Sequence, residues 1–103
     1  MYEKAAAQGH AGAQNNLGYM YENGLGGDQD YAKAKELYEK SAAQGLARAY
    51  YHLGEMYENG KGVEKDYAKA AEYYEEAAAQ GDSDAQKNLD RLRQKISADK
   101  SAN

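Results

Sequence analysis

The sequence predicts an all-α fold built from repeated helix pairs, and three observations lead to this prediction. Residues 5–40 and 41–76 are identical at 22 of 36 aligned positions, and a fixed period of this length is typical of repeat proteins. The chain contains no proline and is rich in alanine, which is the best helix former. Apolar residues in both copies recur at i, i+4, i+7 and i+8, which places them on one face of a helix.

The period also predicts how the 103 residues are organised, as a single domain over 1–103. A partial repeat covers 1–9, because YEKAAAQG at 2–9 matches YEKSAAQG at 38–45. Full repeats cover 5–40 and 41–76. A third copy begins at 77 and changes into a polar sequence, as expected for the last helix of an array. We therefore expect a C-terminal capping helix over 77–97 and a flexible tail over 98–103.

Each repeat is expected to begin with a helix that ends at a glycine, Gly24 in the first copy and Gly60 in the second. Gly18 and Gly54 stand inside this helix, where glycine costs roughly 1 kcal/mol relative to alanine. Because both copies accept this cost, we expect the paired helix to approach the backbone closely there. The apolar face of this helix consists of Ala13, Leu17, Met20 and Tyr21, repeated as Ala49, Leu53, Met56 and Tyr57.

A second helix follows in each copy, and Asp30 and Asp66 stand where its N-cap should be. Gly45 and Gly81 mark its end. His10 and Leu46 occupy the entry to the first helix, where Asp82 of the third copy is a better cap. The core face of the second helix consists of Ala34, Leu37, Tyr38, Ser41 and Ala42, repeated as Ala70, Tyr73, Tyr74, Ala77 and Ala78.

Composition and charge argue against several classes of function. The chain has no cysteine, so disulfides and thiolate metal sites are excluded. Its net charge is −4 with both signs interspersed, which is unlike a nucleic-acid-binding surface. No apolar run is long enough for membrane insertion. The N-terminus lacks the basic start and apolar core of a signal peptide, so we expect a cytoplasmic protein if the chain is complete.

No cofactor, metal or catalytic group is expected from the motifs. His10 and His52 are isolated, without a second ligand at the spacing of a metal site. The loop NGLGGDQD at 23–30 lacks the alternating ligands of a calcium loop and the lysine of a phosphate-binding loop. No serine or threonine stands in a recognisable nucleophile setting. We therefore expect that the protein is not an enzyme.

The pattern A-x-A-Q-x-x-L-G-x-M-Y-E-N-G-x-G-x-x-x-D-Y-x-K-A, followed by A-A-x-Q-G, strongly resembles the Sel1-like repeat, a relative of the tetratricopeptide repeat. The resemblance covers about 2–97. It implies an α/α solenoid with a right-handed superhelical twist, with the first helices on the concave side. Two departures are visible. The loop proline that is frequent in the family is absent, and Gly27 replaces the valine that Val63 retains.

The same resemblance implies that partners bind side chains on the concave face. The types found there favour interfaces, although an exposed face is also free to vary without a function. The face would be acidic and aromatic at one end and basic at the other, which suits an extended peptide or a partner helix. The candidate residues are Asn15, Tyr19, Glu22, Arg48, Tyr51, Glu55, Glu58, Lys87 and Arg91.

Two functions remain open from the sequence. The first is a protein–protein interaction module, an adaptor or scaffold that binds a protein or peptide on its concave face. The alternative is a truncated or engineered repeat array whose main property is self-association. The apolar surface around Ala6, Ala13 and Leu17 would then form a homodimer through the uncapped N-terminal end.

Overall fold

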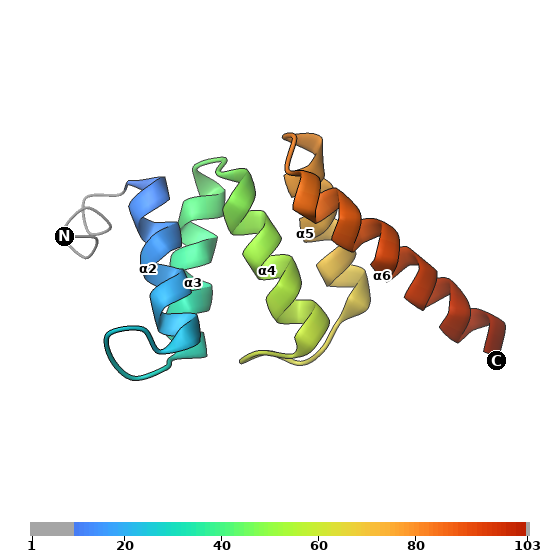
Figure 1. Ribbon diagram of the computed structural model, residues 1–103, viewed down its shortest axis with the longest axis horizontal. Coiled ribbons are helices and arrows are strands. Elements are labelled where there is room, and N and C mark those ends of the chain that lie inside the picture. The colour runs from blue at the N-terminus through green and yellow to red at the C-terminus, as the bar shows by residue number, and fades with distance from the viewer. Residues whose placement is uncertain (1–9, 103) are drawn as a thin grey trace.

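The computed structural model describes the backbone of residues 10–102 and the side chains of residues 10–98. This part of the chain contains helices and no strands. The partial repeat predicted at 1–9 lies outside the described residues. Consecutive helices pack against one another in an elongated array of 49 × 28 × 17 Å (Figure 1). The helices are α2 Ala11–Asn23, α3 Tyr31–Ala43, α4 Ala47–Asn59, α5 Tyr67–Ala79 and α6 Ser83–Ala102.

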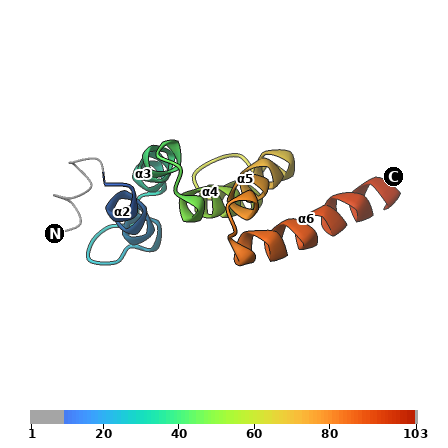
Figure 2. The ribbon, with the colours of Figure 1, turned by 90° about the horizontal axis from the view of Figure 1, so that it is seen from above.

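The helices form two layers, which confirms the all-α repeat solenoid. Figure 1 looks onto the surface formed by α2, α4 and α6, and α3 and α5 lie behind it. The view from above in Figure 2 shows α3 and α5 on the opposite side from α6. We call the surface formed by α2, α4 and α6 the first-helix face, because it presents the first helix of each successive pair.

The predicted helix ends are confirmed. Gly24 and Gly60 adopt left-handed conformations, with φ of 67° and 68°, directly after α2 and α4. Asp30 and Asp66 cap the second helices, and each accepts a hydrogen bond of 3.0 Å from the backbone N–H three residues later. The caps satisfy amides that the first turn of a helix leaves unpaired.

The glycines inside the first helices make room for tyrosine rings, as the repeated cost at these positions predicted. A Cβ atom added to Gly18 would stand 2.9 Å from Cε1 of Tyr38. A Cβ atom added to Gly54 would stand 2.6 Å from Cδ1 of Tyr74. Both tyrosines are fully buried. The glycine of the first helix and the tyrosine of the second are therefore one packing unit in each copy.

The buried apolar clusters extend from one copy into the next. One cluster joins α3 to α4, so the second helix of copy one packs against the first helix of copy two. The other cluster joins α5 to α6 in the same way. Because each core needs the following unit, α6 has to supply apolar residues as the last layer. The first cluster is Ala34, Tyr38, Ala42, Ala49, Leu53 and Met56, and the second is Ala70, Tyr74, Ala77, Ala85, Leu89 and Leu92.

The C-terminal helix differs from the predicted range at both ends. Residues 77–79 form the last turn of α5, and Asp82 then caps α6 by accepting a hydrogen bond of 3.0 Å from the N–H of Ala85. At the other end α6 continues through Ala102, whereas a tail was expected from 98. No glycine or proline interrupts this polar segment, and polar residues between alanines remain compatible with a helix.

Candidate functional site

The nine candidate residues all lie on α2, α4 or α6, but they differ in how far they reach the surface. Tyr19 is 47% exposed, and Lys87 and Arg91 are also exposed. Arg48, Tyr51 and Glu55 are half-buried. The remaining three, Asn15, Glu22 and Glu58, are buried. Only the first six therefore offer substantial side-chain surface to another molecule.

The burial of Glu22 and Glu58 departs from the outward placement that was expected for them. Each is only 5% exposed. The hydroxyl group of Tyr38 donates a hydrogen bond of 2.6 Å to Oε1 of Glu22, and that of Tyr74 donates one of 2.7 Å to Oε1 of Glu58. These bonds join the first and second helix of each copy, so the glutamates stabilise the fold. Burial and the hydrogen bond to a carboxylate both raise the pKa of each tyrosine.

Each buried carboxylate forms an ion pair with a cation from the following copy. Nζ of Lys61, in the loop after α4, lies 3.1 Å from Oε2 of Glu22. Arg91 of α6 donates hydrogen bonds from both Nη atoms to the two oxygens of Glu58, and Nζ of Lys95 lies 3.6 Å away. Burial opposes ionisation of Glu58, but the bonds from Arg91 and Tyr74 outweigh it and lower its pKa. The candidate residue Arg91 is therefore partly committed to a contact within the chain.

Arg48 is also held within the chain. Its Nη1 atom lies 3.2 Å from Oδ1 of Asp82 and 3.0 Å from Oδ2 of Asp84, at the start of α6. Its guanidinium carbon lies 4.2 Å from the ring centroid of Tyr51. Arg48 therefore fixes the ring of Tyr51 and connects α4 to α6, and it is a positioning residue for this face.

His52 was not among the candidate residues, yet it lies at the centre of an aromatic cluster. Its ring stacks on Tyr38, with centroids 4.8 Å apart and an interplanar angle of 16°. Tyr19 of α2 and Tyr51 of α4 flank it, with centroids 5.7 and 5.5 Å from its own. We call Tyr19, Tyr51 and His52 the aromatic shelf. Tyr51 is the neighbour of His52 in the sequence, whereas Tyr19 and Tyr38 reach it only because α2 and α3 pack beside α4.

Glu55 lies at the edge of the aromatic shelf. Its Oε1 atom is 3.6 Å from Nδ1 of His52, and its Oε2 atom accepts a hydrogen bond of 3.2 Å from the hydroxyl group of Tyr51. Burial, and next the nearby carboxylate of Glu55, raise the pKa of Tyr51. Among the described residues, no lysine or arginine forms an ion pair with Glu55. Its side chain is 32% exposed, so its charge faces solvent.

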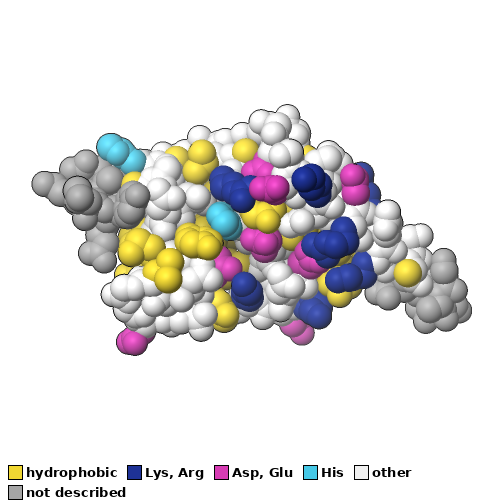
Figure 3. Space-filling view, in the orientation of Figure 1, with side chains coloured by type: hydrophobic (Ala, Val, Ile, Leu, Met, Phe, Trp, Pro, Cys, Tyr) yellow, Lys and Arg dark blue, Asp and Glu magenta, His cyan; other side chains and the backbone are white. Residues whose placement is uncertain are grey.

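The first-helix face does not show the expected separation into an acidic end and a basic end, because acidic and basic side chains lie side by side on it (Figure 3). Hydrophobic side chains lie toward its N-terminal half, and acidic and basic side chains gather over its middle and C-terminal half (Figure 3). The buried candidate residue Asn15 has an Oδ1 atom without a hydrogen-bond partner in the part of the chain that the structure describes.

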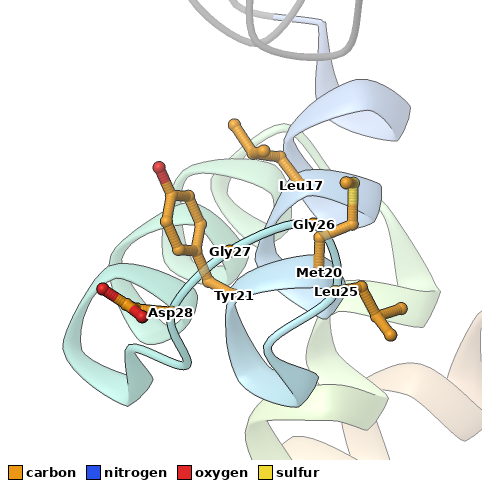
Figure 4. A pocket seen from close by; sticks show the side chains of 7 residues that line it. All are labelled: Leu17, Met20, Tyr21, Leu25, Gly26, Gly27 and Asp28. Atoms are coloured by element: carbon orange, nitrogen blue, oxygen red, sulfur yellow. The ribbon is translucent and has the colours of Figure 1, made fainter.

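A second surface feature lies at the N-terminal end of the array. A cavity of about 180 Å³ opens between α2 and the loop that follows it (Figure 4). Leu17, Met20 and Tyr21 line it from the helix, and Leu25 lines it from the loop. Leu25 is 51% exposed. The equivalent residue of copy two, Lys61, instead forms an ion pair with Glu22 of copy one. We call this feature the N-terminal cavity.

Two further kinds of feature are absent from the described residues. Within them, no three histidine, aspartate or glutamate side chains gather closely enough to hold a metal ion. No helix in this part of the chain combines the length and the apolar character needed to cross a membrane.

Three repeat proteins of known structure are similar to this chain. A Sel1 repeat protein from Oxalobacter formigenes is 43% identical, with a TM-score of 0.82 over 87% of this chain and 68% of that chain. The protective antigen c5321 of uropathogenic Escherichia coli, described as having an SLR fold, is 40% identical, with a TM-score of 0.88 over 92% of this chain and 21% of that one. Cysteine rich protein B of Helicobacter pylori is 31% identical, with a TM-score of 0.78 over 85% and 66%.

The sequence pattern of one family accounts for most of the chain. No protein with a curated description matches closely enough to count as a relative. The Sel1 repeat pattern, however, matches residues 1–10, 11–46 and 47–82. These units keep the period found in the sequence but begin six residues after the predicted copies, because each starts with its first helix, at Ala11 and Ala47. The chain therefore belongs to the Sel1 repeat family.

Proposed function

We propose that this chain is a protein–protein interaction module that binds a protein or peptide partner on its first-helix face. Sel1 repeat proteins generally act as protein–protein interaction scaffolds. The observation that carries the proposal for this chain is the aromatic shelf, because a half-exposed Tyr19 packed against His52 offers aromatic surface on this face. Tyrosine contributes large contact area at interfaces for little loss of side-chain freedom.

The candidate residues divide into two roles in this proposal. Tyr19, Tyr51 and Glu55 contact the partner at the aromatic end, and Lys87 and Arg91 contact it at the basic end. An extended segment with acidic residues at one end would match the basic end, since complementary charges favour association and fix its direction. The others, Asn15, Glu22, Arg48 and Glu58, act indirectly by holding the helices that present these side chains.

We propose a binding role and no catalytic one. A catalytic site needs titratable groups that converge on an accessible pocket. On this face the buried carboxylates of Glu22 and Glu58 are each occupied by a tyrosine hydroxyl and by a cation. We likewise propose no nucleic-acid partner, because the net charge of the chain is −4.

The test is to select binding peptides from a random displayed library with the whole chain as bait, and to measure their affinity for single variants by calorimetry. We expect Tyr19→Ala and Lys87→Glu each to weaken binding at least about fivefold, which corresponds to about 1 kcal/mol. Glu72→Ala, an exposed change on α5 in the opposite layer, is the matched control and should leave affinity unchanged. Peptides that bind equally well to all three variants would refute a partner site on the first-helix face.

Self-association through the N-terminal cavity is the second candidate function. The observation that favours it is Leu25, a large apolar side chain left half-exposed beside a cavity lined by Leu17 and Met20. Exposed apolar patches of this kind commonly mark interaction surfaces. A concentration series in sedimentation should then show a dimer that Leu25→Lys dissociates. A monomer at all concentrations, or a dimer unchanged by Leu25→Lys, would contradict this second candidate.

A further inference from the structure

We propose that the first-helix face carries a subsite for one arginine side chain of the bound partner, formed by Tyr19 and Glu55 next to the buried ring of His52. This inference rests on the proposed function and adds the chemical class that the aromatic end of the face recognises. Two observations carry it: the geometry of the aromatic shelf, and the carboxylate of Glu55 beside it, which forms no ion pair with a lysine or arginine of the described residues.

Within the aromatic shelf the exposed surface belongs mainly to Tyr19, because His52 is only 8% exposed and Tyr51 is half-buried. Tyr38 stacks against His52 from α3, so the ring of His52 cannot retreat into the core. The ring planes of Tyr19 and His52 are tilted by 47°, and those of Tyr51 and His52 by 65°. The three rings therefore do not stack face to face on one another. Tyr19, the most exposed of them, leaves aromatic surface available to a ligand.

Glu55 differs from the other glutamates of α2 and α4 because it forms no ion pair with a lysine or arginine of the described residues. Glu22 is paired with Lys61, and Glu58 is paired with Arg91 and Lys95. Glu55, one turn before Glu58, accepts one hydrogen bond from the hydroxyl group of Tyr51 and lies near His52. A carboxylate has about four acceptor positions, so Glu55 retains capacity for further donors. It is half-buried, and a cation brought to it would be only partly screened by water.

An arginine side chain fits both observations at once. Its guanidinium group is planar, so it can lie against an aromatic ring while its N–H groups bind a carboxylate through two parallel hydrogen bonds. An ammonium group gains the charge interaction but cannot provide the flat contact or the paired donors. Tyr51 already has such a guanidinium contact from Arg48 within the chain, whereas Tyr19 and Glu55 have none among the described residues.

The two histidines of the chain provide a direct probe of this subsite. We would titrate the whole chain with N-acetyl-arginine methylamide at constant neutral pH and follow the ring proton resonances of His52 by NMR. His10, at the exposed start of α2, serves as the internal reference. We expect a saturable shift at His52 and none at His10. Glu55→Gln and Tyr19→Ala should each lower the affinity for the arginine derivative at least about fivefold. The reason is the loss of a charge-assisted hydrogen bond in the first variant and of a cation–π contact in the second.

Ligand controls test the chemistry of recognition. The citrulline derivative has the same shape without the charge, and the lysine derivative has the charge without the planar group. We expect both to bind more weakly than the arginine derivative, whereas Glu72→Gln on α5 should not alter the arginine titration. An equal response of His52 to arginine and citrulline, equal affinity for lysine, or an unchanged titration in Glu55→Gln would overturn the subsite.

The outcome separates this inference from the proposed function. Selected peptides that lose affinity with Tyr19→Ala and Lys87→Glu, but carry no arginine and ignore Glu55→Gln, would support the partner site and refute the arginine subsite. A saturable arginine titration that Glu55→Gln weakens would support the subsite even if no selected peptide depends on Lys87. Circular dichroism of each variant checks that the helices persist.

Discussion

Replacement of Gly54 by alanine should destabilise the protein, although alanine is the better helix former. In most helices this substitution removes a cost of roughly 1 kcal/mol. In α4 the new Cβ atom would stand 2.6 Å from Cδ1 and Cε1 of Tyr74. Carbon atoms prefer separations of about 3.5–4.0 Å, so the ring would have to move by about 1 Å.

That movement is resisted on two sides. Tyr74 is fully buried in the second core cluster, and its hydroxyl group is bound to Glu58 at 2.7 Å. Overpacking of a core costs typically about 1–3 kcal/mol, and a stretched hydrogen bond to a charged group adds to that cost. After the gain in helix propensity is subtracted, we expect Gly54→Ala to lower the free energy of unfolding by about 2 kcal/mol. For a domain of this size the melting temperature should fall by about 10 °C.

Gly12 provides a matched control, because an added Cβ atom there meets nothing within 4 Å. Gly12→Ala in α2 should raise the free energy of unfolding by about 0.4–1 kcal/mol. Gly18→Ala should lie between the two, since its Cβ atom would be 2.9 Å from Tyr38. Urea titrations followed by circular dichroism measure all three. A Gly54→Ala protein as stable as the unmodified chain would refute the close-packing explanation.

Three further changes test the buried contacts and the caps. Tyr74→Phe should lower the free energy of unfolding by about 1.5–3 kcal/mol, because Glu58 loses a donor. Glu58→Gln should weaken the acid dependence of stability, measured as urea midpoints against pH. The folded-state pKa of Glu58 is lowered, so its charge adds stability above the unfolded value of about 4.3 that is lost as the pH falls through the folded pKa. His10→Asp should stabilise α2 by about 1 kcal/mol, since His10 makes no side-chain cap bond.

Each of these three has its own control. Tyr19→Phe removes an exposed hydroxyl group and should change stability by less than about 0.5 kcal/mol. A loss equal to that of Tyr74→Phe would contradict the role of the buried bond. Glu72→Gln should keep the acid dependence of the unmodified chain, and an equal flattening there would argue against Glu58 as the source. His10→Ala provides no capping atom, so a gain equal to that of His10→Asp would exclude capping.

The local features of the fold could be predicted because they depend on residues close together in the chain. The left-handed end of α2 needs only Gly24, and the cap of α3 needs only Asp30 followed by free amides. The repeated glycines at 18 and 54 also predicted a close contact correctly, since a cost accepted twice requires a packing reason. The end of α6 was harder, because no stop residue marks it.

The candidate site could be predicted only in part, because burial on α2 and α4 depends on distant residues. The helical period places Glu22 and Tyr19 on the same side of α2, yet one is buried and the other exposed. The difference comes from Tyr38, sixteen residues after Glu22, and from Lys61 in the next copy. His52 was missed for the same reason. One available signal was position 25, where Leu25 becomes Lys61 while the glutamate stays constant.

The cation that each buried glutamate receives from the following copy means that the copies are not interchangeable modules. Lys61 of copy two completes Glu22 of copy one. If copy one were moved to follow copy two, Leu25 would stand where a cation is needed, and the carboxylate of Glu58 would lose its neighbour. An unpaired buried charge costs about 3–5 kcal/mol. The order of the two copies therefore depends on a single loop position, which is Leu25 in copy one and Lys61 in copy two. Exchanging the copies would destabilise the contact between them, despite their high sequence identity.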